Sequence, residues 1–467
     1  MLALRADGGP GRGVGHLARS LALGEAWVGL GGSCALVSTS VPPPWDDRFV
    51  AGKIPILGSA DELEAKPTWW VVDGYELDGS DAPAGSRVAR IDDGGRSPIA
   101  VAAPPEVVLD QNLGATAADY QDLDADILLG TRYALLRRSL VAASSTRRLD
   151  RRRPLDGATR VLIAMGGSPT LGVRTYFDRV AAGLRDEGAE VMVLGGGDDP
   201  VPDYLVADIA VAASGSTCWE LAAFAIPAVL VAVAPNQVPL AREMAAAGAA
   251  LGLGSIDAVP PSDVVAAVGS IASDGDLRAG LSREIARLVD GRGAARVATR
   301  LRSSLLELRP AAPEDVGIVH TLNDDPVTRA NSWSTDPIPW TDHEHWYASQ
   351  LADPARHLYL ATAPAGDLVG LVRFHVEDRV ATISVVVEPN QRGRGWGAAL
   401  IDAGVRRLHV DLDRAPGATV VERVTAEVKP VNEASSRAFL DADFDREPTS
   451  DVQVIRYARR HGPRTDR

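Results

Sequence analysis

The residues best suited to chemistry lie near the start of the chain, in the segment Gly11-Arg-Gly-Val-Gly15-His16-Leu-Ala-Arg19. His16 and Arg19 are three residues apart, so a helix that begins there presents both side chains on one face. The glycines allow a ligand to approach the backbone, and the helix N-terminus favours an anion such as a diphosphate. An imidazole at that place can transfer a proton near neutral pH. The pattern is also typical of a glycine-rich turn with a helix-capping histidine, and the segment alone leaves both interpretations open.

Two further loops have the composition of phosphate-binding loops. Gly166-Gly-Ser168 and Ser214-Gly-Ser216-Thr217 each follow a predicted strand, and their amides and hydroxyls can surround phosphate oxygens. Glu220 lies one turn into the next helix, where its carboxylate can accept both ribose hydroxyls, and Asn236 and Gln237 offer amides to a sugar. Each feature also has a purely structural explanation, as a strand-to-helix turn, a carboxylate at the positive end of a helix, or a polar turn beside a proline. Their common order and spacing favour a nucleotide-sugar site.

A third group of residues lies near the end of the chain, where a predicted strand enters a glycine-rich turn and then a helix. Val386 and Val387 belong to the strand, and the turn and helix start read Arg392-Gly393-Arg394-Gly395-Trp396-Gly397-Ala398. Successive free amides at such a helix start suit a pyrophosphate. The strand can also bind an extended ligand with amide groups as an added edge strand. An ordinary strand-to-helix turn is the alternative, and the antiparallel strands predicted before it argue against that alternative.

The composition limits the classes of protein to consider. A chain of 467 residues is too long for one hydrophobic core and predicts two or three domains. The formal net charge of −14 argues against a nucleic-acid partner, and the basic run Arg147–Arg153 is interpreted as a solvated linker. The two cysteines, Cys34 and Cys218, are typical of a reducing compartment and exclude a disulfide scaffold.

We expect no membrane span, secretion signal or metal centre from the sequence. The apolar run at the N-terminus is too short for a signal peptide, and no stretch has the uncharged length of a membrane helix. His343 and His345 are two residues apart without cysteines or a carboxylate motif around them, so no metal is expected. These features predict a cytoplasmic protein.

Short apolar runs that alternate with polar or helical segments predict an α/β fold for the first two thirds of the chain. Several predicted strands end on Asp, Asn or Gly, where α/β proteins place ligand groups. The strands of the first series are predicted at 35–38, 69–73, 88–92, 107–109 and 127–129. In the second series, two strands are predicted to start at residues 160 and 191, and two more span 209–213 and 228–233. A helical stretch is predicted from there to residue 304. The two series predict two Rossmann-like domains, residues 1–146 and 147–304, that face a cleft.

The pattern changes at residue 305, and residues 305–460 predict a third domain of the α+β class with a mixed, mostly antiparallel sheet. Its predicted elements are strands at 357–362, 367–375, 381–388 and 424–428 and a helix at 397–408. Ala365-Gly-Asp367 is a plausible hairpin turn between the first two of these strands. From Arg459 onward we expect a loose polar tail.

A series of short motifs runs through residues 1–300 in a characteristic order. They are Arg5-Ala-Asp7, Gly13-Val-Gly-His16-Leu-Ala-Arg19, Asp73-Gly-Tyr75, Ile91-Asp-Asp93, Asp110-Gln-Asn112, Gly130-Thr-Arg-Tyr-Ala-Leu-Leu-Arg137, Gly166-Gly-Ser168, Gly215-Ser-Thr-Cys-Trp-Glu220 and Asn236-Gln237. This order closely resembles the UDP-2,4-diacetamido-2,4,6-trideoxy-β-L-altropyranose hydrolases of pseudaminic acid biosynthesis. The resemblance implies the glycosyltransferase B architecture of two Rossmann-like domains. One departure is that residues 197–208 leave room for only a short link, where such folds often have a strand and a helix.

The same resemblance implies roles for individual residues. His16 corresponds to the histidine that acts in hydrolysis, and we interpret it as the base that deprotonates water for attack on the anomeric carbon. The resemblance places UDP against the second domain, at Ser216, Thr217 and Glu220, with Asn236 and Gln237 nearer the sugar. Asp7 and Tyr75 are expected to line the first-domain side of the cleft. The remaining residues expected in the substrate site are Gly15, Arg19 and Ser168.

The segment Val385–Leu400 resembles the coenzyme loop of the GNAT superfamily of acetyl-CoA-dependent N-acetyltransferases. Asn432 and Ser435, followed by Phe439 and Phe444, resemble the later asparagine segment of that superfamily. The resemblance implies acetyl-CoA as co-substrate. Its binding residues are expected to be Val386, Val387, Arg392, Gly393, Arg394, Gly395, Trp396, Gly397, Ala398, Asn432 and Ser435.

Within this superfamily, Leu322–Arg329 and Glu344-His345-Trp346 most resemble acetyltransferases that act on UDP-linked 4-amino sugars. Acetyl transfer requires a base that takes a proton from the sugar ammonium. Glu427 and Glu388 are the candidates, and both also fit solvated strand residues. Many relatives carry a tyrosine near Phe439 as the acid for the leaving thiolate. Phenylalanine cannot donate a proton, so that step is unassigned, with His345 as a candidate.

These observations together predict a bifunctional enzyme with acetyl-CoA and a UDP-linked amino sugar as its ligands. The C-terminal domain is expected to acetylate the 4-amino group, and the N-terminal pair of domains is expected to release UDP by hydrolysis. A UDP-sugar-dependent glycosyltransferase fused to an acetyltransferase is one alternative, because a shared architecture does not fix the reaction. A nucleotide-sugar-binding protein with a decayed active site is the other.

Overall fold

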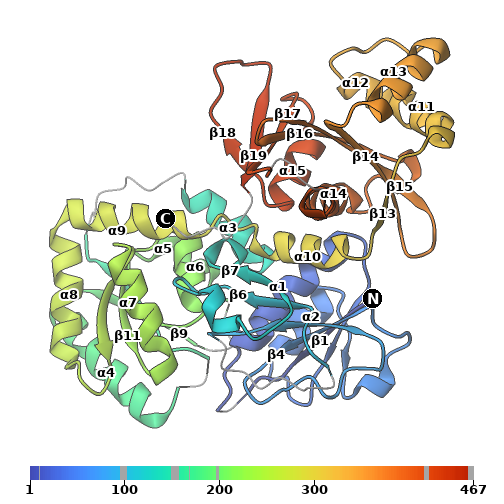
Figure 1. Cartoon of the computed structure of the whole chain (residues 1–467). Coiled ribbons are helices and arrows are strands. Elements are labelled where there is room, and N and C mark those ends of the chain that lie inside the picture. Colours follow the sequence, from blue (N-terminus) through green and yellow to red (C-terminus); the bar gives the residue numbers. More distant parts are fainter. Residues whose placement is uncertain are drawn as a thin grey trace. The chain divides into compact units, whose positions relative to one another are not determined.

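The chain folds into two compact units, which we call unit 1 and unit 2 (Figure 1). Unit 1 comprises Met1–Val28 and Gly32–Ala294, and unit 2 comprises Gly29–Gly31 and the chain from Ala295 onward. This computed structural model describes residues 1–9, 11–94, 103–148, 157–167, 169–195, 199–414 and 420–460.

The first sheet of unit 1 consists of parallel strands in the order β3-β2-β1-β4-β5-β6-β7 (Figure 1). Every residue of β1 and β4 is buried, as expected for parallel strands covered on both faces. The strand order reverses between β1 and β4, and such a switch point leaves a crevice beyond the carboxyl ends of the two strands. The elements are β1 (Leu2–Ala6), α1 (Gly15–Gly29), β2 (Cys34–Val37), α2 (Trp45–Ala51), β3 (Ile56–Leu57), β4 (Trp69–Asp73), β5 (Arg87–Ile91), β6 (Val107–Asp110) and β7 (Asp126–Leu129).

The second sheet of unit 1 consists of parallel strands in the order β12-β11-β10-β8-β9. Alternate strand residues enter two apolar clusters, one with Phe177 and Val268 and the other with Leu140 and Trp219. Helices therefore cover both faces of this sheet. The order reverses between β8 and β10, which places a second crevice beyond their carboxyl ends. The elements are α3 (Arg138–Arg148), β8 (Arg160–Ala164), α4 (Leu171–Asp186), β9 (Glu190–Leu194), α5 (Val201–Val206), β10 (Ile209–Ala213), α6 (Thr217–Ala223), β11 (Ala228–Ala232), α7 (Val238–Ala246), β12 (Leu251–Ser255), α8 (Pro261–Ser273) and α9 (Gly275–Leu288).

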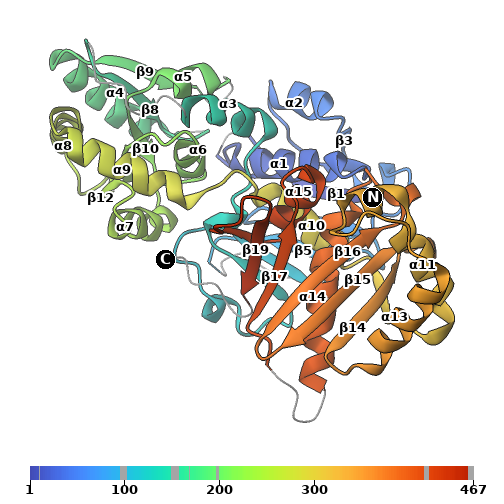
Figure 2. The ribbon, with the colours of Figure 1, turned by 90° about the horizontal axis from the view of Figure 1, so that it is seen from above.

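The sheet of unit 2 has the order β13-β14-β15-β16-β17-β19-β18. Neighbouring strands are antiparallel except β16 and β17, which pair in parallel over Val380–Thr382 and Arg423–Thr425. Figure 2 shows β14, β15 and β16 side by side. On this sheet α13 contacts β14, and α11 contacts β15 and β16. The elements are α10 (Gly293–Ser303), β13 (Glu307–Pro310), α11 (Val316–Asp324), α12 (Pro326–Asn331), α13 (Trp340–Ala352), β14 (Arg356–Thr362), β15 (Leu368–Glu377), β16 (Val380–Val387), α14 (Trp396–Arg414), β17 (Arg423–Val428), α15 (Glu433–Asp441), β18 (Asp445–Glu447) and β19 (Ile455–Arg460).

The predicted α/β class, with parallel sheets followed by a mixed and mostly antiparallel one, is confirmed. Two local expectations were wrong. The stretch expected to be helical after residue 233 contains the strand β12, and Arg459 and Arg460, expected in a loose tail, belong to β19. The short link expected before Asp208 carries the six-residue helix α5. The three-domain division at residues 146 and 304 stays a prediction.

Candidate functional site

Unit 1 contains a pocket of about 670 Å³ at the carboxyl ends of its two sheets. This volume is within the range of sites that enclose small molecules. Loops from both sheets line it, including Gly11–Arg19 after β1, Asp93 and Gly94 after β5, and Ser214–Thr217 after β10. We call this cavity the unit 1 pocket. Both switch points therefore contribute to the same cavity.

His16 lines this pocket and forms a buried pair with Asp73 behind it. The two meet because α1 follows β1 and Asp73 ends the neighbouring strand β4. The Nδ1 atom of His16 lies 2.7 Å from Oδ1 of Asp73, and both residues are buried. Nη2 of Arg19 also lies 3.0 Å from Nδ1, but it donates to Oδ1 of Asp73 at the shorter distance of 2.6 Å. A carboxylate can only accept a hydrogen bond, so the 2.7 Å contact with Asp73 assigns the proton of the neutral imidazole to Nδ1. The Nε2 atom then carries a free lone pair, which is the form that acts as a base.

Arg19 also binds Asp73, and it shares the Oδ1 atom with His16. Its guanidinium donates to both carboxylate oxygens of Asp73, at 2.6 and 3.0 Å, and to Asp93 at 3.1 Å. Burial opposes the charge of Arg19, but Asp73 and Asp93 outweigh it and raise the pKa of the guanidinium. Burial likewise works against the charge of Asp93, but Arg19, Tyr75 and Asn112 lower the pKa of its carboxyl to about 2. Arg19 and Asp93 therefore remain ionised at neutral pH.

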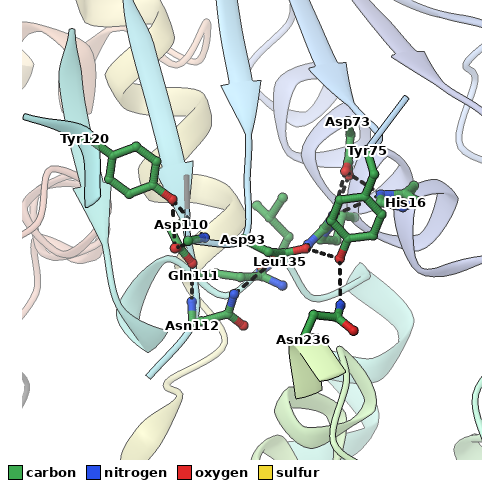
Figure 3. A network of polar contacts seen from close by, with 12 residues as sticks. His16, Asp73, Tyr75, Asp93, Asp110, Gln111, Asn112, Tyr120, Leu135 and Asn236 are labelled. Carbon is green, nitrogen blue, oxygen red and sulfur yellow. Dashed lines mark hydrogen bonds and ion pairs between the residues drawn. The ribbon is translucent and has the colours of Figure 1, made fainter. Parts of the chain in front are cut away.

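Tyr75 connects this network to the second sheet of unit 1 (Figure 3). Its ring packs edge-on against His16, with 5.1 Å between ring centroids, and its hydroxyl donates to Asp93 at 2.6 Å. The same hydroxyl accepts a long hydrogen bond, 3.4 Å, from Asn236 in the 3-10 turn Pro235–Gln237. Burial and the Asp93 carboxylate raise the pKa of Tyr75, so it stays a neutral donor. Tyr75 thus fixes the ring of His16 and reaches across the pocket.

The second sheet contributes a carboxylate and two glycine loops. Glu220, on α6, accepts a 2.6 Å hydrogen bond from Tyr204, and burial raises the pKa of its carboxyl against the opposing effects of Arg137 and Tyr204. A Cβ atom on Gly15 would lie 3.3 Å from Ser216 Oγ, and one on Gly167 would lie 2.5 Å from Val14. The loops after β1, β8 and β10 therefore approach closely, so that a side chain at Gly167 would collide with Val14 and one at Gly15 would press on Ser216.

Most of the residues predicted for the nucleotide-sugar site line the unit 1 pocket. They are Gly15, His16, Arg19, Tyr75, Ser216, Thr217, Glu220, Asn236 and Gln237. Gln237 uses its side-chain oxygen to accept from the Val233 amide, at 3.0 Å. Ser168 lies outside the described residues. Asp7 is not among the lining residues, because its carboxylate accepts hydrogen bonds from Ser38 and Thr39 and pairs with Arg5 at 3.0 Å.

Four pocket-network residues were given no role by the sequence, namely Asp73, Asp93, Asn112 and Arg137. Each occurs in one of the motifs that carry the hydrolase resemblance. The available signal was the position of Asp73 and Asp93 at or just beyond the ends of neighbouring parallel strands. The pairing of these carboxylates with Arg19 is visible only once β4 and β5 are placed side by side.

In unit 2, the predicted coenzyme loop joins β16 to α14. Gly393 and Gly395 adopt positive φ values of 73° and 74°, and α14 begins at Trp396. The first amides of a helix have no partner within it, so Trp396, Gly397 and Ala398 are positioned to bind an anion. Arg392 instead secures the loop internally, because its guanidinium donates to Asp325 at 2.5 Å and to Val387.

The parallel pairing of β16 with β17 stops at Thr382 and Thr425, before the predicted coenzyme residues Val386 and Val387 are reached. Asn432 caps α15, since its side-chain oxygen accepts from the Ser435 amide at 3.1 Å. Both predicted asparagine-segment residues are therefore at the start of that helix.

The acid and base candidates of unit 2 have different surroundings. Glu427 is exposed on β17 and accepts from Arg456 at 3.0 Å, while Glu388 accepts from the Asn390 amide at 2.7 Å. His345 is exposed on α13. Phe439 is buried, with its ring 5.7 Å from that of Tyr457 and stacked on it. The surroundings of these four residues identify none of them as the acid for the thiolate.

Residues 306–445 match the family described as the acetyltransferase (GNAT) domain. A search of the curated proteins gives no match. The solved structures similar to this chain include a spermidine N-acetyltransferase from Vibrio cholerae in complex with CoA and spermine. The two sequences are 18% identical, the match covers 34% of this chain and 96% of that chain, and the TM-score is 0.30. They also include an aminoglycoside acetyltransferase in complex with coenzyme A. It is 18% identical, the match covers 33% of this chain and 94% of that chain, and the TM-score is 0.28.

Within the described ranges, no group of three or more His, Cys, Asp or Glu side chains is arranged to hold a metal ion. No helix in the same part of the chain is long and apolar enough to cross a membrane.

On the strength of the family match, residues 306–445 form a GNAT acetyltransferase domain, and enzymes of this class use acetyl-CoA.

Proposed function

We propose that the chain is a bifunctional enzyme that acts on a UDP-linked amino sugar. In this proposal, unit 1 is a pair of Rossmann-like domains of glycosyltransferase B type, with boundaries at residues 1–146 and 147–304, and hydrolyses the bond between sugar and UDP. Residues 305–460 transfer an acetyl group to the 4-amino group of the precursor. The observation that carries the hydrolase half is the 2.7 Å pair of His16 and Asp73 on a pocket of about 670 Å³.

In the proposed hydrolysis, Nε2 of His16 takes a proton from a water molecule as its oxygen attacks the anomeric carbon. The bond from that carbon to the diphosphate oxygen breaks, and UDP leaves with its electron pair. Asp73 holds the imidazole in the required tautomer and stabilises the imidazolium, as the carboxylate of a catalytic triad does. UDP is a good leaving group, so the reaction requires little help from an acid. Amides of the glycine loops at Gly15, Gly166 and Gly215 support the developing charge.

The proposed nucleotide-sugar contacts follow from the lining of the unit 1 pocket. Ser216 and Thr217, at the start of α6, are suited to phosphate, and Glu220 is suited to the ribose hydroxyls. Asn236 and Tyr75, already within 3.4 Å of each other, are placed to contact the sugar from opposite sides.

In the proposed acetyl transfer, the amine nitrogen attacks the thioester carbon of acetyl-CoA, and the C–S bond breaks to release coenzyme A. The coenzyme is assigned to Val386, Val387, Asn432, Ser435 and the loop and helix start at 392–398. Glu427 is the proposed base that takes the ammonium proton. A UDP-linked 4-amino sugar is the proposed acceptor, because it joins both halves of the chain in one reaction sequence.

The test is product analysis by mass spectrometry after incubation of the full chain with a UDP-linked 4-amino sugar. With acetyl-CoA we expect the N-acetylated nucleotide sugar, followed by free sugar and UDP without any added acceptor. The His16→Asn variant should retain UDP binding and acetylation and lose UDP release. Release that requires a sugar acceptor would identify a glycosyltransferase instead, and an unchanged rate in His16→Asn would reject the role of this residue.

A further inference from the structure

Arg137 is a buried cation on the unit 1 pocket for which neither the motifs nor the mechanism above supplies a role. It lies between the 3-10 turn Thr131–Tyr133 and α3, and it is 6% exposed. Its side chain is one of those that line the pocket. A guanidinium removed from water to this extent is costly unless hydrogen bonds or an opposite charge compensate it.

The partners of Arg137 do not provide that compensation. Among the described residues its guanidinium donates no hydrogen bond, and its Nε atom is buried without a partner. Its nearest carboxylate oxygen is Glu220 Oε1, 3.9 Å from Nη2, which is beyond hydrogen-bond distance. Its guanidinium carbon also lies 5.4 Å from the ring centroid of Trp45, within the range of a cation–π contact.

Other arginines of the same pocket are paired much more closely. Arg19 lies 2.6 Å from Asp73, Arg12 lies 2.7 Å from Glu76, and Arg242 lies 2.8 Å from Glu243. Glu220 is also a poor counter-charge for Arg137, because Tyr204 occupies one of its oxygens at 2.6 Å and burial disfavours its ionised form. The charge of Arg137 is therefore available to an anion in the pocket.

We propose that Arg137 binds a phosphate group of the ligand in the unit 1 pocket and selects a nucleoside diphosphate over the nucleoside. This inference rests on the proposed function for the identity of the ligand. The fork of N–H donors on a guanidinium matches the geometry of phosphate oxygens. Glycine loops after β8 and β10 line the same cavity and offer amides to the same group. Glu220, beside Arg137, then binds the ribose hydroxyls.

The test compares the binding of UDP, uridine and pyrophosphate to the full chain by calorimetry, in the parent and in Arg137→Gln. We expect the parent to bind UDP more tightly than uridine, and Arg137→Gln to weaken UDP about 10- to 100-fold without changing uridine. Arg137→Lys keeps the charge but not the fork, so its loss should be intermediate. Arg138→Gln is the matched control, because Arg138 is the adjacent exposed arginine and does not line the pocket.

The outcomes separate this inference from the function on which it rests. Equal losses for UDP and uridine, with a native circular dichroism spectrum, would mean a structural role and overturn the inference. Unchanged UDP binding in Arg137→Gln would overturn it while leaving the proposed hydrolase intact. A parent that binds pyrophosphate but not UDP would refute the proposed function, and loss of pyrophosphate binding in Arg137→Gln would still support the anion site.

Discussion

The geometry of His16 depends on Asp73 and Arg19 acting together. Arg19 satisfies both oxygens of Asp73 and prevents the carboxylate from turning, and Asp73 then orients Nδ1 of His16. A histidine on the first turn of α1 would otherwise be free to select among several rotamers. Substitutions that keep the volume of these side chains but change their hydrogen bonding are therefore the informative ones.

Asp73→Asn should lower the rate of UDP release by on the order of 10³- to 10⁴-fold and leave UDP binding nearly unchanged. Either orientation of the new amide sets its NH₂ group against a donor, namely Nη2 of Arg19 in the Oδ1 position or Nε of Arg19 in the Oδ2 position. The variant therefore loses both the negative charge beside His16 and one hydrogen bond of the network that orients the imidazole. Initial rates of UDP release measure the effect. Asp78→Asn is the control, since Asp78 is half-buried, does not line the unit 1 pocket and accepts a local hydrogen bond from the Ser80 amide at 2.9 Å. A rate in Asp73→Asn equal to that of this control would contradict the proposed base.

Asp110 should make the stability of unit 1 depend on pH. Burial raises the pKa of its carboxyl to about 6, despite hydrogen bonds from Asn112 and Tyr120. The folded state therefore binds the proton more tightly than the unfolded chain, so the contribution of Asp110 is fully present below about pH 4 and is lost as the pH rises through 6. The expected loss is about 3 kcal/mol. The free energy of unfolding of Asp110→Asn, measured by urea titration from pH 4 to 7, should lack this decline, and parallel profiles would contradict the prediction.

The sequence could indicate pocket residues where a motif joined a strand end to a helix start, as at His16 and Ser216. It could not predict that Asp7 would turn away, because its partners Ser38 and Thr39 follow a different strand. The same limit applies to Arg137. Its neighbours Trp45 and Glu220 lie on α2 and α6, and both are far from Arg137 in the sequence.

Among the elements, β12 illustrates why strand prediction failed locally. The segment Leu251-Gly-Leu-Gly-Ser lacks the β-branched residues that usually mark a strand, and it lies at the edge of its sheet with an irregular register. Gly252 is required there because α7 packs directly on the strand, and a Cβ atom would lie 2.4 Å from the carbonyl oxygen of Ala241. By contrast, strands such as β4 and β10 were predicted at their observed bounds because they are continuous apolar runs.

Gly252→Ala should therefore lower the free energy of unfolding of unit 1 by about 1–3 kcal/mol, because α7 must shift away from β12. Gly269→Ala is the matched control, since no atom lies within 4 Å of the added methyl group on α8. It should be neutral or stabilise by about 0.5–1 kcal/mol, because alanine favours the helix. Thermal and urea unfolding followed by circular dichroism measure both changes, and a destabilised control would remove the basis of the comparison.

At the scale of the whole molecule, the two proposed activities reside in separate compact units, each with its own sheet or sheets and apolar core. Sequence patterns predicted this change of fold class because buried parallel strands read as continuous apolar runs and the later strands alternate. The exchange of β18 and β19 at the end of the unit 2 sheet was not predicted, since three-residue strands such as β18 carry too little pattern.

Gly393→Val should raise the KM for acetyl-CoA at least about 10-fold and leave UDP release unchanged, because a β-branched residue opposes the positive φ of the loop. Gly366→Val is the control. Gly366 has a similar φ of 85° in a hairpin turn, and at both glycines nothing lies within 4 Å of the added Cβ. The two variants should lose similar stability, and only the first should impair acetylation. Equal acetylation kinetics in both would contradict the assigned coenzyme loop.

The short pairing of β16 with β17 has a consequence for hydrogen exchange. Beyond Thr382, β16 is paired with β15 but the described chain gives it no pairing with β17, so every second amide from Ile383 to Val387 faces away from a partner strand. Those amides should exchange with deuterated solvent far faster than their neighbours. A coenzyme whose pantetheine amides lie along this edge would slow them, and the protection pattern would reveal its position residue by residue without any measurement of turnover.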